Sequence, residues 1–106
     1  MQPYYKVGDS VDLSGTNSVT FEGCAWNKNM SFQYVFSTVV GTATIVLQAS
    51  NDGTNFDSIS GYSDNAVTES GSGSFQLTGS SAVSYRVAAS VAATSGSMVV
   101  TSVGNG

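Results

Sequence analysis

The chain has 106 residues, of which 41% are hydrophobic and 9% are charged, and its formal net charge is −4. This length and hydrophobic content predict a single domain over residues 1–106, because a chain of this size can bury one core. The cations Lys6, Lys28 and Arg86 are scattered and cannot build the positive surface that binds phosphates, so we expect no nucleic-acid partner.

The sequence contains no histidine and a single cysteine, Cys24. Ser-His-Asp triads, Cys–His nucleophile pairs and histidine zinc sites are therefore excluded, and so is an intrachain disulfide. No apolar run approaches the roughly 20 residues that cross a membrane, and the first residues lack the apolar core of a signal peptide. We accordingly predict a non-enzymatic protein with no cofactor and no membrane span.

The polar residues are mainly Ser, Thr, Gly and Asn, and the charged fraction is far below the quarter or so of typical soluble domains. A surface of hydroxyls and amides suits extracellular or particle-bound β-proteins, whose exposed strands carry Thr and Ser. Such a surface without a signal peptide indicates a protein that is made in a host cytoplasm and meets the outside as part of a particle.

The first part of the chain predicts short strands separated by turns. Residues 4–7 favour a short strand or an N-terminal arm within residues 1–8, since Pro3 limits pairing before them. Apolar residues then alternate with polar ones over 11–13 and 19–25. The next strand carries the largest alternating side chains, which we expect to form the middle of the core: Met30, Phe32, Tyr34 and Phe36.

The segment 39–59 predicts a β-hairpin. Its first strand places Ala43, Ile45, Leu47 and Ala49 on one face, and Thr and Gln on the other, which indicates a sheet with one buried face. Val46 interrupts the polar face, so we expect that face to be partly covered. The run 50–55, Ser-Asn-Asp-Gly-Thr-Asn, consists of residues that tolerate positive φ or bond their own backbone and therefore predicts the turn.

The remainder of the chain also predicts strands. Residues 61–73 are rich in Ser, Asp and Gly and indicate a long loop or a weak edge strand, and alternating apolar residues follow over 75–77, 83–89 and 98–103. No segment shows helical periodicity of useful length. About eight strands at regular spacing predict an all-β, single-domain antiparallel β-sandwich, either jelly-roll or immunoglobulin-like.

The turn of the hairpin offers the only metal candidate. Asn51, Asp52, Asn55 and Asp57 supply oxygen ligands at short spacing, as a calcium site requires. The order of an EF-hand loop and its closing Glu are absent, and Asp-Gly is also a common hairpin turn. We expect a plain turn, with calcium as the alternative.

Two further groups of charged residues are ambiguous. Asp64 and Glu69 lie in a Ser-rich stretch and would form either an acidic patch or a solvated loop. Arg86 follows Tyr85 on a strand whose odd positions look buried, so it would pair with a carboxylate such as Glu22 or anchor an interface.

Residues 41–56 run from an apolar strand through Ser-Asn-Asp-Gly-Thr-Asn to an aromatic residue, Phe56. With Ser-Tyr-Arg-Val at 84–87 and the Gly-containing strand at 95–100, this pattern resembles small β-sandwich modules of bacteriophage virion proteins and of some bacterial surface proteins. In those modules the aromatic residue is usually Trp. The resemblance implies a β-sandwich in a viral particle, but such modules occur in tail fibres, capsid decoration proteins and carbohydrate-binding domains alike.

We therefore expect a structural protein of a virus particle, most specifically a phage capsid decoration (cement) or minor shell protein. It would bind the major capsid protein or other virion proteins, self-associate as a homo-oligomer, and reside at the virion surface. Tyr4, Tyr5 and Lys6 are the expected interface residues, since aromatic anchors are enriched at interfaces. The alternative is a receptor- or glycan-binding module of a phage spike or tail fibre, which would bind a host-surface glycan through the loops at 51–55 and 61–73.

Overall fold

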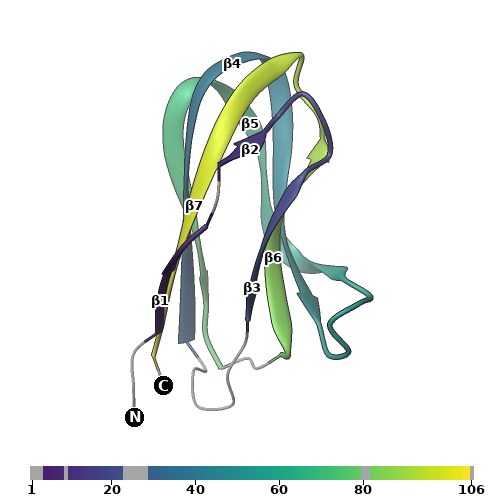
Figure 1. Cartoon of the computed structure of the whole chain (residues 1–106), viewed down its shortest axis with the longest axis vertical. Coiled ribbons are helices and arrows are strands. Elements are labelled where there is room, and N and C mark those ends of the chain that lie inside the picture. The colour runs from purple at the N-terminus through teal and green to yellow at the C-terminus, as the bar shows by residue number, and fades with distance from the viewer. Residues whose placement is uncertain (1–3, 9, 23–28, 80–81, 106) are drawn as a thin grey trace.

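The computed structural model describes residues 4–8, 10–22, 29–79 and 82–105, with the backbone alone for residues 4–7, 22 and 105. Within these ranges the chain is all-β and contains no helix (Figure 1). No helix that could cross a membrane is found there either. The strands are β1 (Tyr4–Val7), β2 (Val11–Asp12), β3 (Ser18–Glu22), β4 (Asn29–Ser50), β5 (Asp57–Leu77), β6 (Ser84–Val91) and β7 (Ser95–Asn105).

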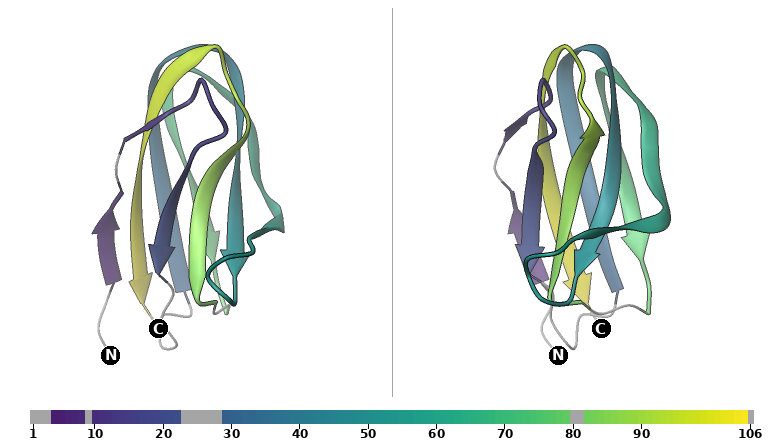
Figure 2. Two further views of the ribbon diagram at one scale, coloured as in Figure 1. Left: turned by 45° about the vertical axis from the view of Figure 1, so that its right-hand side comes forward. Right: turned by 90° about the vertical axis from the view of Figure 1, so that its right-hand side faces the viewer.

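The strands form two facing layers, because β4 and β5 bend over one end of the molecule and take part in both (Figures 1 and 2). What we call the front sheet runs in the order β1 with β2, β7, residues 29–37 of β4, and residues 71–77 of β5. The back sheet runs β3, β6, residues 43–50 of β4, and residues 57–67 of β5. All pairings are antiparallel, which confirms the antiparallel β-sandwich.

The order of the strands distinguishes between the two sandwiches that the sequence left open. Counting β1 with β2 as one strand and each half of β4 and β5 separately gives eight positions along the chain. The first pairs with the eighth, the second with the seventh, the third with the sixth, and the fourth with the fifth. This is a long hairpin wrapped around a core, which is the jelly-roll arrangement.

Bulges produce the bend of β4. Between Phe36 and Val39 this strand carries one residue more than β5, and between Ser37 and Val40 it carries one more than β7. The extra residue is Thr38, which has a φ of 54°, and Gly41 follows with a φ of 83°. Extra residues of this kind kink a strand and increase its twist, which lets one strand leave the front sheet and enter the back sheet.

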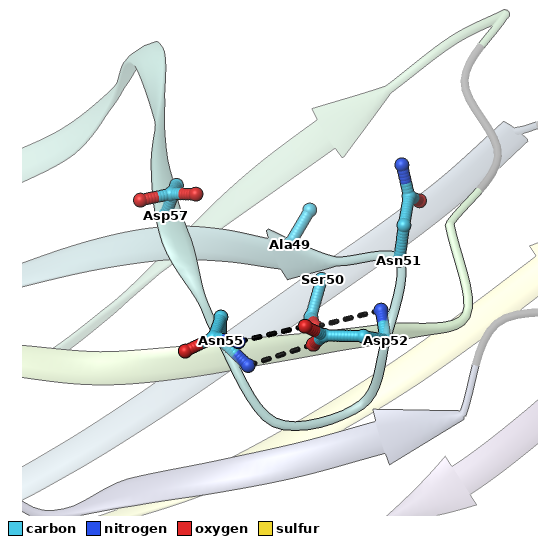
Figure 3. Close-up of a pocket in the computed structure, with 6 residues that line it drawn as sticks. All are labelled: Ala49, Ser50, Asn51, Asp52, Asn55 and Asp57. Carbon is cyan, nitrogen blue, oxygen red and sulfur yellow. Dashed lines mark hydrogen bonds between the residues drawn. The ribbon is translucent and has the colours of Figure 1, made fainter.

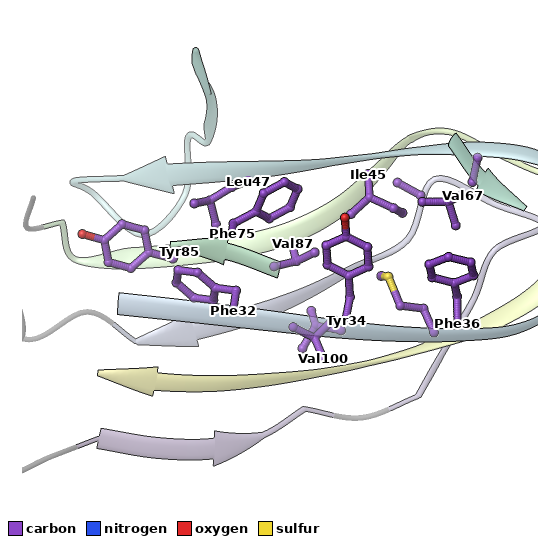
Figure 4. Close-up of a cluster of buried hydrophobic side chains, with 14 of the residues drawn as sticks. Phe32, Tyr34, Phe36, Ile45, Leu47, Val67, Phe75, Tyr85, Val87 and Val100 are labelled. Atoms are coloured by element: carbon purple, nitrogen blue, oxygen red, sulfur yellow. The ribbon is translucent and has the colours of Figure 1, made fainter. Parts of the chain in front are cut away.

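The core lies between the sheets and is dominated by aromatic rings (Figure 4). Phe32 contacts Phe21 and Tyr85, each with ring centroids 5.7 Å apart. Tyr34 lies 5.3 Å from Phe75, also between ring centroids. As predicted, the residues at 30, 32, 34 and 36 are buried.

Two of these rings lie over glycines on the neighbouring strand. Tyr34 pairs with Gly73, and Phe36 pairs with Gly71. A Cβ at Gly71 would lie 3.1 Å from the Phe36 ring, and one at Gly73 would overlap the Tyr34 side chain. The glycines of β5 therefore provide the space that the aromatic side chains of β4 occupy, as in the aromatic rescue of edge glycines.

Candidate functional site

The turn at residues 50–55 is built around the carboxylate of Asp52 (Figure 3). Its Oδ1 accepts hydrogen bonds from the backbone N–H groups of Thr54 and Asn55, both at 2.8 Å, and from the hydroxyl of Ser50 at 2.9 Å. Its Oδ2 accepts one from the side-chain amide of Asn55 at 2.7 Å. These donors, with the backbone N–H of Asn55 foremost, hold the pKa of Asp52 well below its usual range.

Around this turn lies an open depression of about 370 Å³, lined by Ala49, Ser50, Asn51, Asp52, Asn55 and Asp57. Figure 3 shows Asp57 on the strand that leaves the turn, apart from the hydrogen-bonded group of Asp52, Ser50 and Asn55. The four calcium candidates thus line one depression. However, both oxygens of Asp52 already accept hydrogen bonds from the loop, which is the arrangement of a self-supporting Asx turn.

Arg86 connects this turn to the back sheet. Its Nε donates a hydrogen bond to Oε1 of Gln48, the residue opposite it on β4. Its guanidinium carbon lies 4.3 Å from the centre of the Phe56 ring, a cation–π contact. Gln48 in turn donates to Ser58 at 3.2 Å. Arg86 therefore holds the end of the turn against the outer surface of the sheet. The side chain of Glu22 lies outside the described residues, so pairing with this carboxylate stays a prediction, and so does a role at an interface.

Asp64 and Glu69 lie on β5, so the stretch 61–73 is the edge strand rather than the loop. Tyr34 reaches across the core and its hydroxyl donates a hydrogen bond of 2.5 Å to Oδ2 of Asp64. Burial of the Tyr34 side chain, and then this bond, raise the pKa of Tyr34 above its usual range. Glu69 has a φ of 60° at the bend of β5, and Val67 separates it from Asp64 as a buried residue. The two carboxylates are not joined by a shared contact.

The outer face of the front sheet is a surface that the sequence analysis did not identify. It displays alternate residues of three neighbouring strands, none of which is charged: Ser31, Gln33, Val35 and Ser37 on β4, Ser97, Val99, Thr101 and Val103 on β7, and Ser72, Ser74 and Gln76 on β5. Val35 and Val99 are directly opposite one another and are 52% and 38% exposed. The sequence shows the alternation that places these residues on one face of each strand. It does not show the strand order that brings the three strands together.

The predicted interface residues Tyr4, Tyr5 and Lys6 belong to β1. Their backbone pairs with β7, where Tyr4 is opposite Gly104, Tyr5 opposite Val103 and Lys6 opposite Ser102. Their side chains lie outside the described part of the chain, as do Cys24 and residues 1–3. Their role at an interface therefore stays a prediction.

No protein-family model and no curated protein sequence matches the chain. Several solved structures share its fold. The exported protein XepA of PBSX superposes with a TM-score of 0.62 at 14% identity, over 97% of this chain and 37% of that one. The enzymatically active domain of tailspike protein 4 of bacteriophage CBA120 superposes with a TM-score of 0.56 at 14% identity, over 94% of this chain and 17% of that one.

A third similar structure is the family 29 carbohydrate-binding module from Piromyces equi. It has a TM-score of 0.55 at 8% identity, and the match covers 96% of this chain and 91% of that one. Identities this low show the shared β-sandwich fold alone. The match therefore covers most of the carbohydrate-binding module but only a part of XepA and of the tailspike domain.

Proposed function

We propose that this protein is a non-catalytic structural component of a phage particle, a capsid decoration or minor shell protein that binds the particle surface and self-associates. The observation that carries the proposal is the uncharged outer face that β5, β4 and β7 form in the front sheet, with Asp12 of β2 at its margin. A sheet face without charge can pack against another protein surface without burying an unpaired charge, which is the main electrostatic cost of forming an interface.

Most of the aromatic side chains in the described part of the chain belong to the core, and Phe56 and Tyr62 are half-buried. Six of the aromatic side chains are buried in the core: Phe21, Phe32, Tyr34, Phe36, Phe75 and Tyr85. The exposed large hydrophobic residues of the described chain are all valines. A sheet face of valines and hydroxyls can be covered by another protein without burying an unpaired charge. The jelly roll occurs in viral shell proteins and in lectins alike, so the fold by itself favours neither role.

A receptor- or glycan-binding module of a spike or tail fibre is the second candidate. The observation that favours it is the open depression at residues 49–57, whose amide, hydroxyl and carboxylate groups could bind sugar hydroxyls. The family 29 carbohydrate-binding module and the phage tailspike domain, both of this fold, agree with that reading. On this reading the loop would face away from the particle.

Quantitative mass spectrometry of purified phage particles from the source tests the proposal. We expect many copies of this chain, in a simple ratio to the major capsid protein. A few copies, or about a dozen at a vertex or tail, would favour the spike or fibre module. Absence from washed particles would overturn both virion readings. Binding of the purified protein to a glycan array, compared with that of an Asn51→Ala variant, would then test the depression directly.

A further inference from the structure

Sheet edges expose unpaired backbone groups that can join another strand, and proteins usually protect them. Three of the four edges in this sandwich carry such protection. The front-sheet edge formed by β1 and β2 is interrupted between Val7 and Val11, and β3 at one back-sheet edge has only 5 residues. At the other back-sheet edge, Val46 pairs with Ser63 and Gln48 pairs with Ser58. Between these two pairs β5 contains more residues than β4, so this edge is bulged.

The fourth edge, residues 71–77 of β5, has no such protection. It pairs with β4 without a register shift, from Leu77 opposite Met30 to Gly71 opposite Phe36. Its sequence, Gly-Ser-Gly-Ser-Phe-Gln-Leu, contains no charge and no proline. In the described chain β5 has no neighbour other than β4, and both halves of β5 lie at the same side of the molecule in the right-hand view of Figure 2. This edge is therefore regular and open to a further strand.

We propose that residues 71–77 pair with the same residues of a second copy of this chain. The two strands would run antiparallel around a twofold axis at Ser74 and would join the two front sheets into one continuous sheet. This inference rests on the self-association in the proposed function and specifies which residues form the contact. Its test uses the purified protein and needs no phage particle.

The side chains of this strand fit such a pairing. Residues that lie opposite each other in a sheet point to the same face, so exposed residues must meet exposed ones. With Ser74 opposite Ser74, the exposed Ser72 meets the exposed Gln76. On the inner face, Gly73 meets Phe75 and Gly71 meets Leu77, so that each residue without a side chain faces a large one. This register also pairs all of residues 71–77.

Charge at the edge is compatible with a second copy of this chain as the partner. Each copy carries a formal net charge of −4, so two copies repel unless they meet where carboxylates are absent. The strand 71–77 and the outer face beside it supply such a region. In the proposed register Glu69, the nearest carboxylate on β5, would lie opposite Gly79 of the other copy and not opposite another acid. The pairing therefore places no like charges against each other.

Sedimentation velocity and light scattering of the purified protein test the proposal. We expect a concentration-dependent species of twice the 10.9 kDa monomer mass. Ser74→Lys lies at the exposed centre of the edge and would place two lysines directly opposite each other. It should weaken the dimer at least tenfold, although it makes the net charge less negative. A protein that stays monomeric up to millimolar concentration would overturn the proposal.

The matched control is Gln33→Lys. Gln33 is also exposed, pairs directly with Ser74, and lies one strand further from the edge. It introduces the same charge on the same outer face, so it should leave the dimer intact if the edge forms the contact. A dimer that Gln33→Lys disrupts and Ser74→Lys does not would assign self-association to the sheet face and overturn the edge pairing. Circular dichroism of both variants checks that each is folded.

A cross-link tests the register. In a Cys24→Ser background, Ser74→Cys places two cysteines opposite each other across the axis, within about 4.5–5.5 Å between Cβ atoms. Mild oxidation should give a disulfide-linked dimer at position 74, and Ser72→Cys in the same background should cross-link much more slowly. Equal cross-linking at both positions would contradict the register. Particle mass spectrometry remains a separate readout, so failure of the pairing and failure of the virion role can be distinguished.

Discussion

Gly73→Ala is the substitution that best tests how the core of this sandwich is built. A Cβ at this position would lie 2.5 Å from Cζ and 2.9 Å from Cε2 of Tyr34, and would overlap its hydroxyl. The ring cannot easily move away, because Tyr34 is 2% exposed and contacts Phe75, with its hydroxyl bonded to Asp64. The added methyl group must therefore displace a fixed ring.

The expected cost follows from three contributions. Forcing an extra methyl group into a packed core costs about 1–3 kcal/mol. Moving the hydroxyl of Tyr34 weakens its hydrogen bond to the carboxylate of Asp64, and a bond to a charged group contributes about 1.5–3 kcal/mol. Replacing Gly by Ala in a strand returns roughly 0.5–1 kcal/mol of backbone entropy. We expect a net loss of about 2–4 kcal/mol, which for a domain of this size lowers the melting temperature by about 9–18 °C.

Urea unfolding followed by tryptophan fluorescence and circular dichroism measures this loss. Gly71→Ala is the matched control, because it lies on the same face of the same strand beneath Phe36, with a closest approach of 3.1 Å. That contact requires a shift of only a few tenths of an ångström, so Gly71→Ala should cost less than about 1 kcal/mol. If the two variants unfold at the same urea concentration, the reasoning about Tyr34 is refuted.

Two further predictions concern the turn and the bend. Asp52 has a lowered pKa, so it stabilises the fold above its unfolded pKa of about 4, and this stabilisation is lost as the pH falls toward the folded value. Asp52→Asn should therefore show a smaller decrease in urea midpoint than the native protein between pH 5 and pH 2.5; an equal decrease would argue against this role. Thr38 has a φ of 54°, a backbone conformation that costs energy for a residue with a Cβ but not for glycine. Thr38→Gly should therefore raise the free energy of unfolding by about 0.5–1 kcal/mol. A lower urea midpoint for this variant would show that the backbone at Thr38 is not strained.

The sequence predicted the strands better than the connections between them. Alternation located the buried residues of β4 on both sides of the bend, since Phe36 and Ala43 are both buried. It also indicated separate strands, because the polar residues around Thr38 and Gly41 break the alternation. In the structure these residues form bulges within one continuous strand. A bulge shifts the side-chain pattern without ending the pairing, and that difference is visible only when the neighbouring strands are known.

The same limit applies to the candidate sites. The turn at 50–55 was predictable because Asp52 acts on residues two and three positions along the chain. The contact of Arg86 with Phe56 and the hydrogen bond from Tyr34 to Asp64 join residues 30 positions apart. Nothing in the sequence near one partner indicates the other.

The covered face predicted from Val46 is confirmed, since this residue is 8% exposed.

The topology also limits what the open edge can form. Because the β4–β5 hairpin folds over on itself, β5 supplies one edge of each sheet, but only residues 71–77 are regular and free of charge. The opposite edge of the front sheet is interrupted between β1 and β2. A contact between two identical edges around a twofold axis consumes both and leaves no equivalent site for a third copy. The edge pairing therefore leads to a closed dimer and not to an open fibre, and larger assemblies would require a different surface.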